Sequence, residues 1–474
     1  MGASFFAVKA TLSLINQTFK DQTVMTAIRS KLQKNFHCLW AVICQEKATH
    51  FAKEKFMAQI TDTLLADIRA RFAHVSDCPF SGPRIFFENA GGALTLNSVV
   101  ATTAKFAAIP DNQGRANAGA EALVNIIKTA KADMAMFFNA PQGQFFVGES
   151  GTELTYRLIR TAVMGTPAGS VIGSTVEHPA SRSAAKHWAT AAKKSYISAP
   201  HDDATGLVTA DAYTKLMTPD VRVATILHTS PVTGMAIDVA RIASAIRAIS
   251  PDCFIIVDGI QHASHGLIDI AAYDVDGYVV SPYKVFSRHG YGVAWASDRL
   301  SKLPLEALID GPLENWEMGT RDTGAYATFS DVVHYFEWLG SQISDAKDRR
   351  VRVEAAGAAI KAHEKTLTDT MLNGTGNLPG LLDFDGVTIV GGADNPAREG
   401  LVCFALDTVP ALDIVEKLND QGIRTHIRKA DHYSGNILTP LGLQAAVRVS
   451  MCHYNSLEEV TAFLAAMKSI ADNA

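Results

Sequence analysis

The sequence of 474 residues lacks any apolar run that approaches the roughly 18–20 residues of a membrane-spanning helix. It also lacks an excess of positive charge, because 43 lysines and arginines stand against 48 aspartates and glutamates. We therefore predict neither a membrane nor a nucleic acid as partner. The six cysteines are scattered without a C-x-x-C pair, so we expect reduced thiols and a cytoplasmic location.

Common phosphate-binding and nucleophile signatures are missing too. Neither G-x-G-x-x-G nor G-x-x-x-x-G-K-[ST] occurs between a predicted strand and a predicted helix, so a nucleotide-binding fold is not indicated. The run that starts at Gly148 begins like the serine elbow G-x-S-x-G, but Thr152 stands where the second glycine is needed. Serine hydrolysis is therefore not predicted.

Residues 1–57 differ from the rest of the chain in composition. From Met1 to Gln45 there are five basic residues and one acidic residue, and apolar residues recur at roughly helical spacing. This composition is similar to that of a mitochondrial targeting segment, although arginine is scarce for one. We interpret residues 1–57 as a helical N-terminal extension and keep mitochondrial targeting as the alternative.

Beyond this extension, short apolar runs alternate with helical patterns, which predicts an α/β fold with a mainly parallel sheet. Strands are predicted at 144–147, 170–173, 223–227, 254–257, 278–280 and 292–295, with helices at 180–192 and 240–249. A helical stretch at 326–371 leads to a second, smaller α/β unit with strands near 388–390, 400–405 and 446–450. The predicted domains are residues 58–95 packing on the small domain, a large domain at 96–340, and a connecting helix with the small domain at 341–474.

Two strand ends carry the residues that point most directly to a function. Asp258 and Gln261 follow one buried run, and Ser281 and Lys284 follow the next. In such folds, ligands bind at the carboxyl ends of the strands. A lysine can form a Schiff base with a pyridine aldehyde, and a carboxylate can keep the ring nitrogen protonated. The pair therefore predicts pyridoxal 5'-phosphate (PLP) as cofactor.

Two further segments suit the same cofactor. Gly151 and Thr152 follow a strand and open a helix, where free N–H groups, the helix dipole and a hydroxyl can hold a phosphate. Ser281 offers a second phosphate contact. His178 ends another strand, and its imidazole can stack on the cofactor ring, although a lone histidine is more often structural.

A metal site is the alternative interpretation of this region. Asp258, His262 and His265 give a D-x-x-x-H-x-x-H order of ligand types. Both imidazoles share a face only in a helix, and Gly259 and Gly266 disfavour a regular helix here. We therefore place the PLP site first and predict no metal.

Taken in order, the motifs resemble the class V aminotransferase and cysteine desulfurase family of PLP enzymes, which have the aspartate aminotransferase fold, fold type I. The resemblance extends from about residue 85 to residue 467. It is carried by Phe87–Gly92, Ser150–Glu153, Glu177–His178, Val232–Gly234, Val257–Gln261, Ser281–Lys284, Met318–Thr320, Val447–Ser450 and His453–Asn455. It implies a large domain with a sheet of the seven-stranded type and a smaller C-terminal α/β domain.

The resemblance also implies roles for the cofactor residues. Lys284 would be the Schiff-base lysine and the proton shuttle at Cα, and Asp258 would pair with the pyridinium nitrogen. Gln261 would approach the phenolic oxygen, and His178 would stack on the ring. The phosphate contacts would be Gly151, Thr152 and Ser281.

Substrate and subunit contacts follow from the same resemblance. Arg448 would bind the substrate α-carboxylate through its planar guanidinium. Asn89 would belong to the substrate site. Thr320 would reach the phosphate of a neighbouring subunit, which implies a homodimer with shared sites.

The chain departs from the desulfurases where their chemistry depends on sulfur. Asp431–Ser434 stands where desulfurases carry a catalytic cysteine in a His-Cys loop. Tyr283 replaces the usual histidine, and Pro231 replaces an asparagine. Cys452 shares strand parity with Arg448, but a cysteine among apolar residues is more often part of the core. Desulfuration through a cysteine relay is therefore not expected.

What remains is PLP chemistry on an α-amino acid. Lys284 would remove the Cα proton, and later proton transfers would decide between transamination, β-elimination and epimerisation. We expect aminotransferase-type chemistry first, and a C–S or β-elimination lyase or an epimerase second. A PLP-fold protein that binds without turnover is the alternative of another class, and the intact Lys284–Asp258 pair argues against it.

Overall fold

The structure is a computed structural model that describes residues 60–311 and 315–473. The extension predicted for residues 1–57 lies outside the described residues. By its contacts the chain divides into Met1–Ala58 and Gln59–Ala474, and all of the described residues belong to the second unit. Within the described ranges, no helix has both the length and the apolar character needed to cross a membrane.

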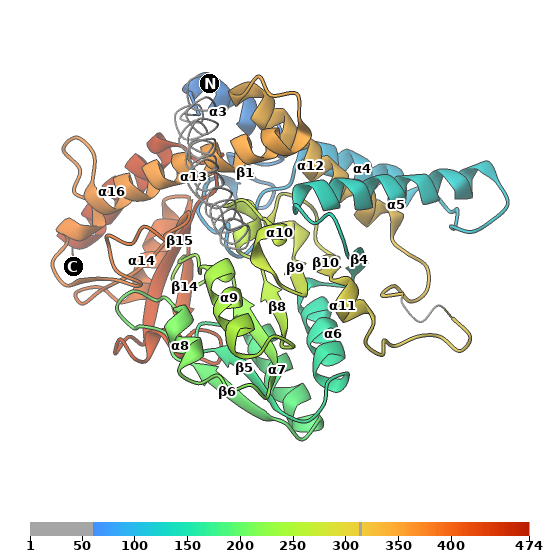
Figure 1. Cartoon of the computed structure of the whole chain (residues 1–474). Helices are drawn as coiled ribbons and strands as arrows, with labels where there is room; N and C mark the ends of the chain where they lie inside the picture. Colours follow the sequence, from blue (N-terminus) through green and yellow to red (C-terminus); the bar gives the residue numbers. More distant parts are fainter. Residues whose placement is uncertain (1–59, 312–314, 474) are drawn as a thin grey trace, which may run out of the picture. The chain divides into compact units, whose positions relative to one another are not determined.

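Seven strands form the large sheet, in the spatial order β4-β10-β9-β8-β7-β5-β6 (Figure 1). They are β4 (Gln144–Gly148), β5 (Ser170–Ser174), β6 (Ser195–Ala199), β7 (Val221–Leu227), β8 (Phe254–Asp258), β9 (Gly277–Val280) and β10 (Gly292–Ala296). Strands β5 to β9 are parallel, whereas β10 runs antiparallel to both of its neighbours. The predicted α/β fold is confirmed, and each of the six predicted strands of this sheet is present.

Helices cover both faces of this sheet, and the strand sequences show why. Ile255 and Val257 of β8 belong to one hydrophobic cluster, whereas Phe254 and Ile256 belong to another. Successive side chains of a strand point to opposite faces, so a continuous apolar run is needed to bury both. The helices of this part are α6 (Gly151–Met164), α7 (Pro179–Ala191), α8 (Ala210–Thr214), α9 (Val239–Ile249), α10 (Ile270–Tyr273) and α11 (Asp298–Ser301).

Five further helices precede or follow the strands of this sheet in the described part of the chain. They are α3 (Asp62–Arg69), α4 (Asn97–Ala107), α5 (Ala118–Phe137), α12 (Thr323–Ile343) and α13 (Arg349–Asn373). The helical stretch predicted at 326–371 is thus two helices. Asp348 caps the start of α13 by accepting a hydrogen bond from the Val351 amide. A carboxylate at this position satisfies a free backbone donor, so it favours a new helix start.

A smaller sheet of four strands has the order β11-β12-β15-β14. It belongs to the C-terminal part of the chain, which is coloured orange to red in Figure 1. Its strands are β11 (Val387–Ile389), β12 (Leu401–Leu406), β14 (His426–Lys429) and β15 (Ala445–Ser450), with helices α14 (Ala411–Asp420), α15 (Gly435–Leu438) and α16 (Leu457–Asp472). Strand β3 (Ile85–Phe86) pairs in parallel with β13 (Ile423–Arg424). The domain boundaries near residues 95 and 340 stay predictions.

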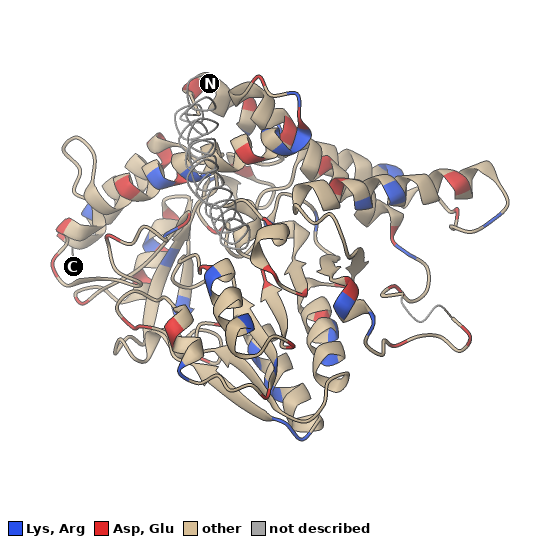
Figure 2. Cartoon of the chain, viewed as in Figure 1, with Lys and Arg blue, Asp and Glu red and all other residues tan. Residues whose placement is uncertain are grey.

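Positions of basic and acidic residues are interspersed along the elements visible in Figure 2. No element in this view carries a broad stretch of one sign, which agrees with the net charge of −5. The charges that bear on function are instead few and buried.

Candidate active site

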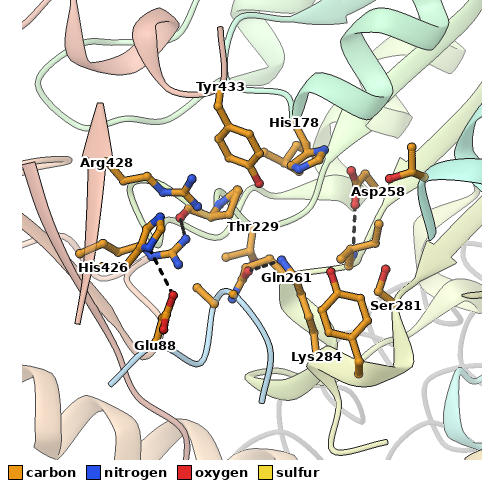
Figure 3. Close-up of a pocket in the computed structure, with 18 residues that line it drawn as sticks. Glu88, His178, Thr229, Asp258, Gln261, Ser281, Lys284, His426, Arg428 and Tyr433 are labelled. Carbon is orange, nitrogen blue, oxygen red and sulfur yellow. Dashed lines mark hydrogen bonds and ion pairs between the residues drawn. The ribbon is translucent and has the colours of Figure 1, made fainter. Parts of the chain in front are cut away.

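One cavity brings together most of the residues predicted from the strand ends (Figure 3). The space inside it, the open mouth included, is about 770 Å³. It is lined by the predicted residues Thr152, His178, Asp258, Gln261, Ser281, Lys284 and Arg448. They meet because β8 and β9 are adjacent and parallel, with Asp258 opposite Val279, so both chains leave the sheet at one edge.

Lys284 lies at the base of this cavity, at the end of the short 3-10 helix Pro282–Lys284 that follows β9. Its side chain is buried, and Nζ donates a hydrogen bond of 3.4 Å to Oε1 of Gln261 (Figure 3). Burial, with the charge of Arg448 as the next cause, lowers the pKa of Lys284 to about 7. A substantial fraction of the amine is therefore neutral near pH 7, which is the form that attacks a carbonyl.

The Asp258 carboxylate is held rigidly beside it. Oδ2 accepts a hydrogen bond of 3.0 Å from the Ser181 hydroxyl, and Oδ1 accepts one of 3.1 Å from the Ile260 amide. Burial raises the pKa of Asp258. A cation in the cavity would favour the ionised form of this carboxyl group, because opposite charges at short range stabilise one another.

His178 presents a neutral ring to the cavity. It caps α7, where Nδ1 accepts a hydrogen bond of 3.1 Å from the Ala180 amide. Burial, assisted by the nearby charges of Lys284, Arg428 and Arg182, lowers the pKa of His178 to about 3. The imidazole is therefore uncharged at neutral pH and can pack against an aromatic ligand.

The first residue of α6, Gly151, packs closely against Ser281. Ser150 caps this helix of 14 residues by accepting a hydrogen bond from the Glu153 amide at 3.1 Å. A Cβ atom on Gly151 would collide with the Ser281 hydroxyl oxygen and lie 2.7 Å from Cδ1 of Ile260. Only glycine at this position lets the N-terminus of α6 lie so close to Ser281 and Ile260. A helix N-terminus with free N–H groups suits an anion.

A buried hydrogen-bond chain continues behind Lys284. Nε2 of Gln261 lies 3.3 Å from Nε2 of His265, whose Nδ1 lies 2.9 Å from Oε2 of Glu364. These side chains are buried. Because the Gln261 amide donates to His265 on one side, its oxygen is directed at Lys284 on the other.

The alternative metal set is not assembled. Asp258 bonds to Ser181, whereas His262 lies 2.7 Å from Glu399 and His265 lies 2.9 Å from Glu364. Across the part of the chain that the structure describes, the one group of ligand-type side chains close enough to share an ion is His265, Glu364 and Cys452. Neither Asp258 nor His262 belongs to it. Cys452 is buried in that group and does not line the cavity.

Three predicted site residues, Gly151, Asn89 and Thr320, are not among the residues that line the cavity. Asn89 is buried, and its amide nitrogen donates to the carbonyl of Ser450 at 2.8 Å and to the side chain of Asn455 at 3.2 Å. Its side chain thus ties the turn to β15, and its place in a substrate site stays a prediction. Thr320 is exposed in the loop before α12.

The structure adds residues that the sequence motifs did not single out. Glu88, His426, Arg428 and Tyr433 also line the cavity (Figure 3). Arg428 and His426 lie on β14, a strand of sequence His-Ile-Arg-Lys that has no apolar alternation to reveal it. Tyr433 packs edge-on against His178, with ring centroids 4.9 Å apart.

A sheet of seven strands with a buried lysine and a buried carboxylate at adjoining strand ends is the arrangement of PLP enzymes of fold type I. The family model described as aminotransferase class-V matches residues 85–463. The chain belongs to this family, whose members are PLP-dependent enzymes that act on amino acids.

Individual relatives agree with this assignment. The chain is 28% identical over 416 residues, 82% of its length and 91% of the relative's, to a probable cysteine desulfurase of Xylella fastidiosa. It is 24% identical to a probable cysteine desulfurase of Mycolicibacterium paratuberculosis, and that match spans 86% of this chain and 58% of the relative. A solved apo cysteine desulfurase of Thermococcus onnurineus NA1 shares the fold, with a TM-score of 0.71 and 19% identity over 85% of this chain and 98% of that one.

Proposed function

We propose that this chain binds PLP and transfers protons at the Cα atom of an α-amino acid, with aminotransferase-type chemistry. The observation that carries the proposal is the buried Lys284 amine, whose pKa is about 7, in one cavity with Asp258 and the start of α6. When bound, PLP supplies an aldehyde for an amine and a ring that accepts electron density from Cα.

The residues present suit each part of this cofactor. The α6 N-terminus with Gly151, Thr152 and Ser281 offers N–H and hydroxyl donors to its phosphate. Asp258 offers a fixed carboxylate to the ring nitrogen, and the neutral His178 ring can lie against the pyridine. Gln261 is held beside Lys284, where an amide can hydrogen-bond to the ring oxygen.

Lys284 and Arg448 would divide the work on the substrate. A lysine with a pKa of about 7 can take a proton from Cα and return it near neutral pH. Arg448 donates to the Pro231 carbonyl through Nη1 at 3.1 Å, and its Nε has no partner among the described residues. Its remaining donors are available to hold an α-carboxylate, which fixes the Cα–H bond relative to Lys284.

A sulfur relay has no thiol in this cavity. The described cysteines are Cys78, Cys253, Cys403 and Cys452, and none of them is among the residues that line it. Tyr433, in the segment Asp431–Ser434 that takes the place of the desulfurase cysteine loop by resemblance, lines the cavity with a ring and no thiol. We therefore favour aminotransferase-type chemistry over cysteine desulfuration.

A homodimer is part of the same proposal. Thr320 is exposed and lies outside the cavity of its own chain, so it is available for the predicted contact with the phosphate of a second subunit. Light scattering should give twice the mass of one chain. Mixing an inactive Lys284→Ala chain with a Thr320→Val chain should yield some sites with both native residues, and hence recovered activity.

The central experiment is absorption spectroscopy of the protein loaded with PLP. We expect a visible band from the covalent bond between Lys284 and the cofactor aldehyde. Lys284→Ala should lose it, and Lys302→Ala, which removes an exposed lysine, should keep it. A wild-type protein that stays colourless with PLP would contradict the proposal.

A second measurement separates the possible reactions. Single-turnover mixing with a panel of amino acids should convert the cofactor to pyridoxamine phosphate without releasing ammonia. Release of ammonia together with a keto acid in repeated turnover would indicate β-elimination, and loss of optical activity alone would indicate epimerisation.

A further inference from the structure

Two buried arginines face the cavity from the small sheet. Arg448 is 1% exposed and Arg428 is 9% exposed, and both line the cavity. No carboxylate among the described residues lies within ion-pair distance of either guanidinium, and Nε of each is buried without a partner. Burying an unpaired cation is costly, so the absence of a protein carboxylate indicates a ligand that supplies the negative charge.

The register of the small sheet explains why the two arginines act at one place. In the antiparallel pair β14 and β15, His426 lies opposite Arg448. Arg428 is two residues further along β14, so its side chain is on the same face as those of His426 and Arg448. The proximity has an electrostatic effect, since burial lowers the pKa of Arg448 to about 9 and Arg428 is the largest charge contribution to this shift.

The carboxylates of the cavity wall form no ion pair with either of these two guanidiniums. Glu88 lies 3.2 Å from Nδ1 of His426 (Figure 3). It also pairs with Nε of Arg424 at 2.7 Å. Asp258 is bound by Ser181 and the Ile260 amide. Two guanidiniums therefore remain for anions that enter the cavity.

The α-carboxylate of a substrate would pair with only one of the two guanidiniums. A carboxylate and a planar guanidinium match as a bidentate pair, and of the two arginines Arg448 has the larger electrostatic effect on Lys284. The residues proposed for the cofactor phosphate, Thr152 and Ser281, belong to the large-sheet side of the cavity and include no arginine. Arg428 is thus left for a second anionic group of the substrate.

We propose that the preferred substrates are α-amino acids whose side chain carries an anionic group, which Arg428 binds while Arg448 binds the α-carboxylate. This inference rests on the proposed function and adds the substrate class. Tyr433 supports the geometry, because its ring packs against the Arg428 guanidinium at 4.4 Å. A guanidinium held in this way is preorganised to bind an anion. It distinguishes an anionic substrate side chain from a neutral one of the same size by charge.

The test compares isosteric pairs, L-aspartate with L-asparagine and L-glutamate with L-glutamine. Rapid mixing with the PLP-loaded protein gives a dissociation constant for each from the amplitude of the spectral change. In the wild type, at least one acidic member should bind about 10- to 100-fold more tightly than its amide, the range of a charge-assisted hydrogen bond. Arg428→Gln should reduce this ratio to about 1 and change the affinity for the amide less than about 3-fold.

Two further variants control the interpretation. Arg428→Lys keeps the charge without the planar fork, so it should retain an intermediate preference. Lys429→Gln removes an exposed charge from the next position of β14, which points to the other face, and should retain the full preference.

The outcomes distinguish this inference from the proposed function. Equal binding of acid and amide by the wild type overturns the inference alone. Equal loss of both in Arg428→Gln also overturns it, because Arg428 would then serve the α-carboxylate. A loaded protein whose spectrum responds to none of the four amino acids contradicts the inference and the proposed function together.

Discussion

The guanidinium of Arg428 lies over the ring of Tyr433, 4.4 Å from its centroid. Tyr433 in turn meets His178 edge-on, with 4.9 Å between ring centroids. Tyr433 thus connects the basic face of the small sheet with the wall of the large one by packing against both side chains.

Removal of the Tyr433 ring should therefore weaken substrate binding. We expect Tyr433→Ala to raise KM for the preferred amino acid by about 2- to 30-fold, the range of a cation–π contact, with a smaller change in kcat. Tyr433→Phe keeps the ring and should stay within about 2-fold of the wild type. If the phenylalanine variant loses as much as the alanine variant, mostly in kcat, the hydroxyl takes part in the chemistry instead.

Asp258→Asn should slow turnover far more than it weakens cofactor binding. An amide keeps the shape and one acceptor oxygen but cannot hold the ring nitrogen protonated, so we expect kcat to fall by about 100- to 1,000-fold. Ser181→Ala removes one hydrogen bond to this carboxylate and should lower kcat by about 10-fold or less. Steady-state kinetics with saturating PLP measure both, and a nearly active Asp258→Asn would exclude this role for Asp258.

Gly151→Ala should impair the binding of PLP. The added methyl group would meet the Ser281 hydroxyl and the Ile260 side chain, which widens the gap between them and should lower the affinity for PLP by about 5- to 100-fold. Gly357→Ala, in the middle of α13, meets atoms no closer than 3.8 Å and should leave the affinity unchanged. Equilibrium titration of the apoproteins with PLP compares the two, and equal affinities would contradict the phosphate site.

The stability of the apoprotein should depend on pH through Lys284. Its pKa falls from 10.5 to about 7 on burial, so between these values the unfolded chain binds the proton and the folded chain does not. Folding is therefore penalised most at or below pH 7, and the penalty is relieved as pH rises, at up to about 1.4 kcal/mol per pH unit.

Urea unfolding of the apoproteins at several pH values measures this effect. Lys284→Met should be more stable than the wild type near pH 7, and the difference should shrink toward pH 10.5. The exposed Lys302→Met should follow the wild type at every pH. Parallel curves for wild type and Lys284→Met would show that the amine keeps its ordinary pKa.

Strong local patterns explain what could be predicted from the sequence. The runs Phe254–Asp258 and Gly277–Val280 are buried on both faces, and a stretch of β-branched and aromatic residues has few other stable conformations. Since parallel strands end at one edge, the proximity of Asp258 and Lys284 followed directly. A motif gives a position in the chain and not a side-chain direction, so the hydrogen bonds of Asn89 to Ser450 and Asn455 could not be predicted in this way.

The sequence by itself thus determined the α/β fold, the strand ends and the lysine–carboxylate pair, because each depends on residues that are close along the chain. Only the tertiary structure decided which cations share the cavity. Strand β14 is four residues long and mostly polar in sequence. It is held in place by its antiparallel pairing with β15. Arg428 and Arg448 come together through that long-range pairing, and their shared positive charge defines the substrate class that we propose.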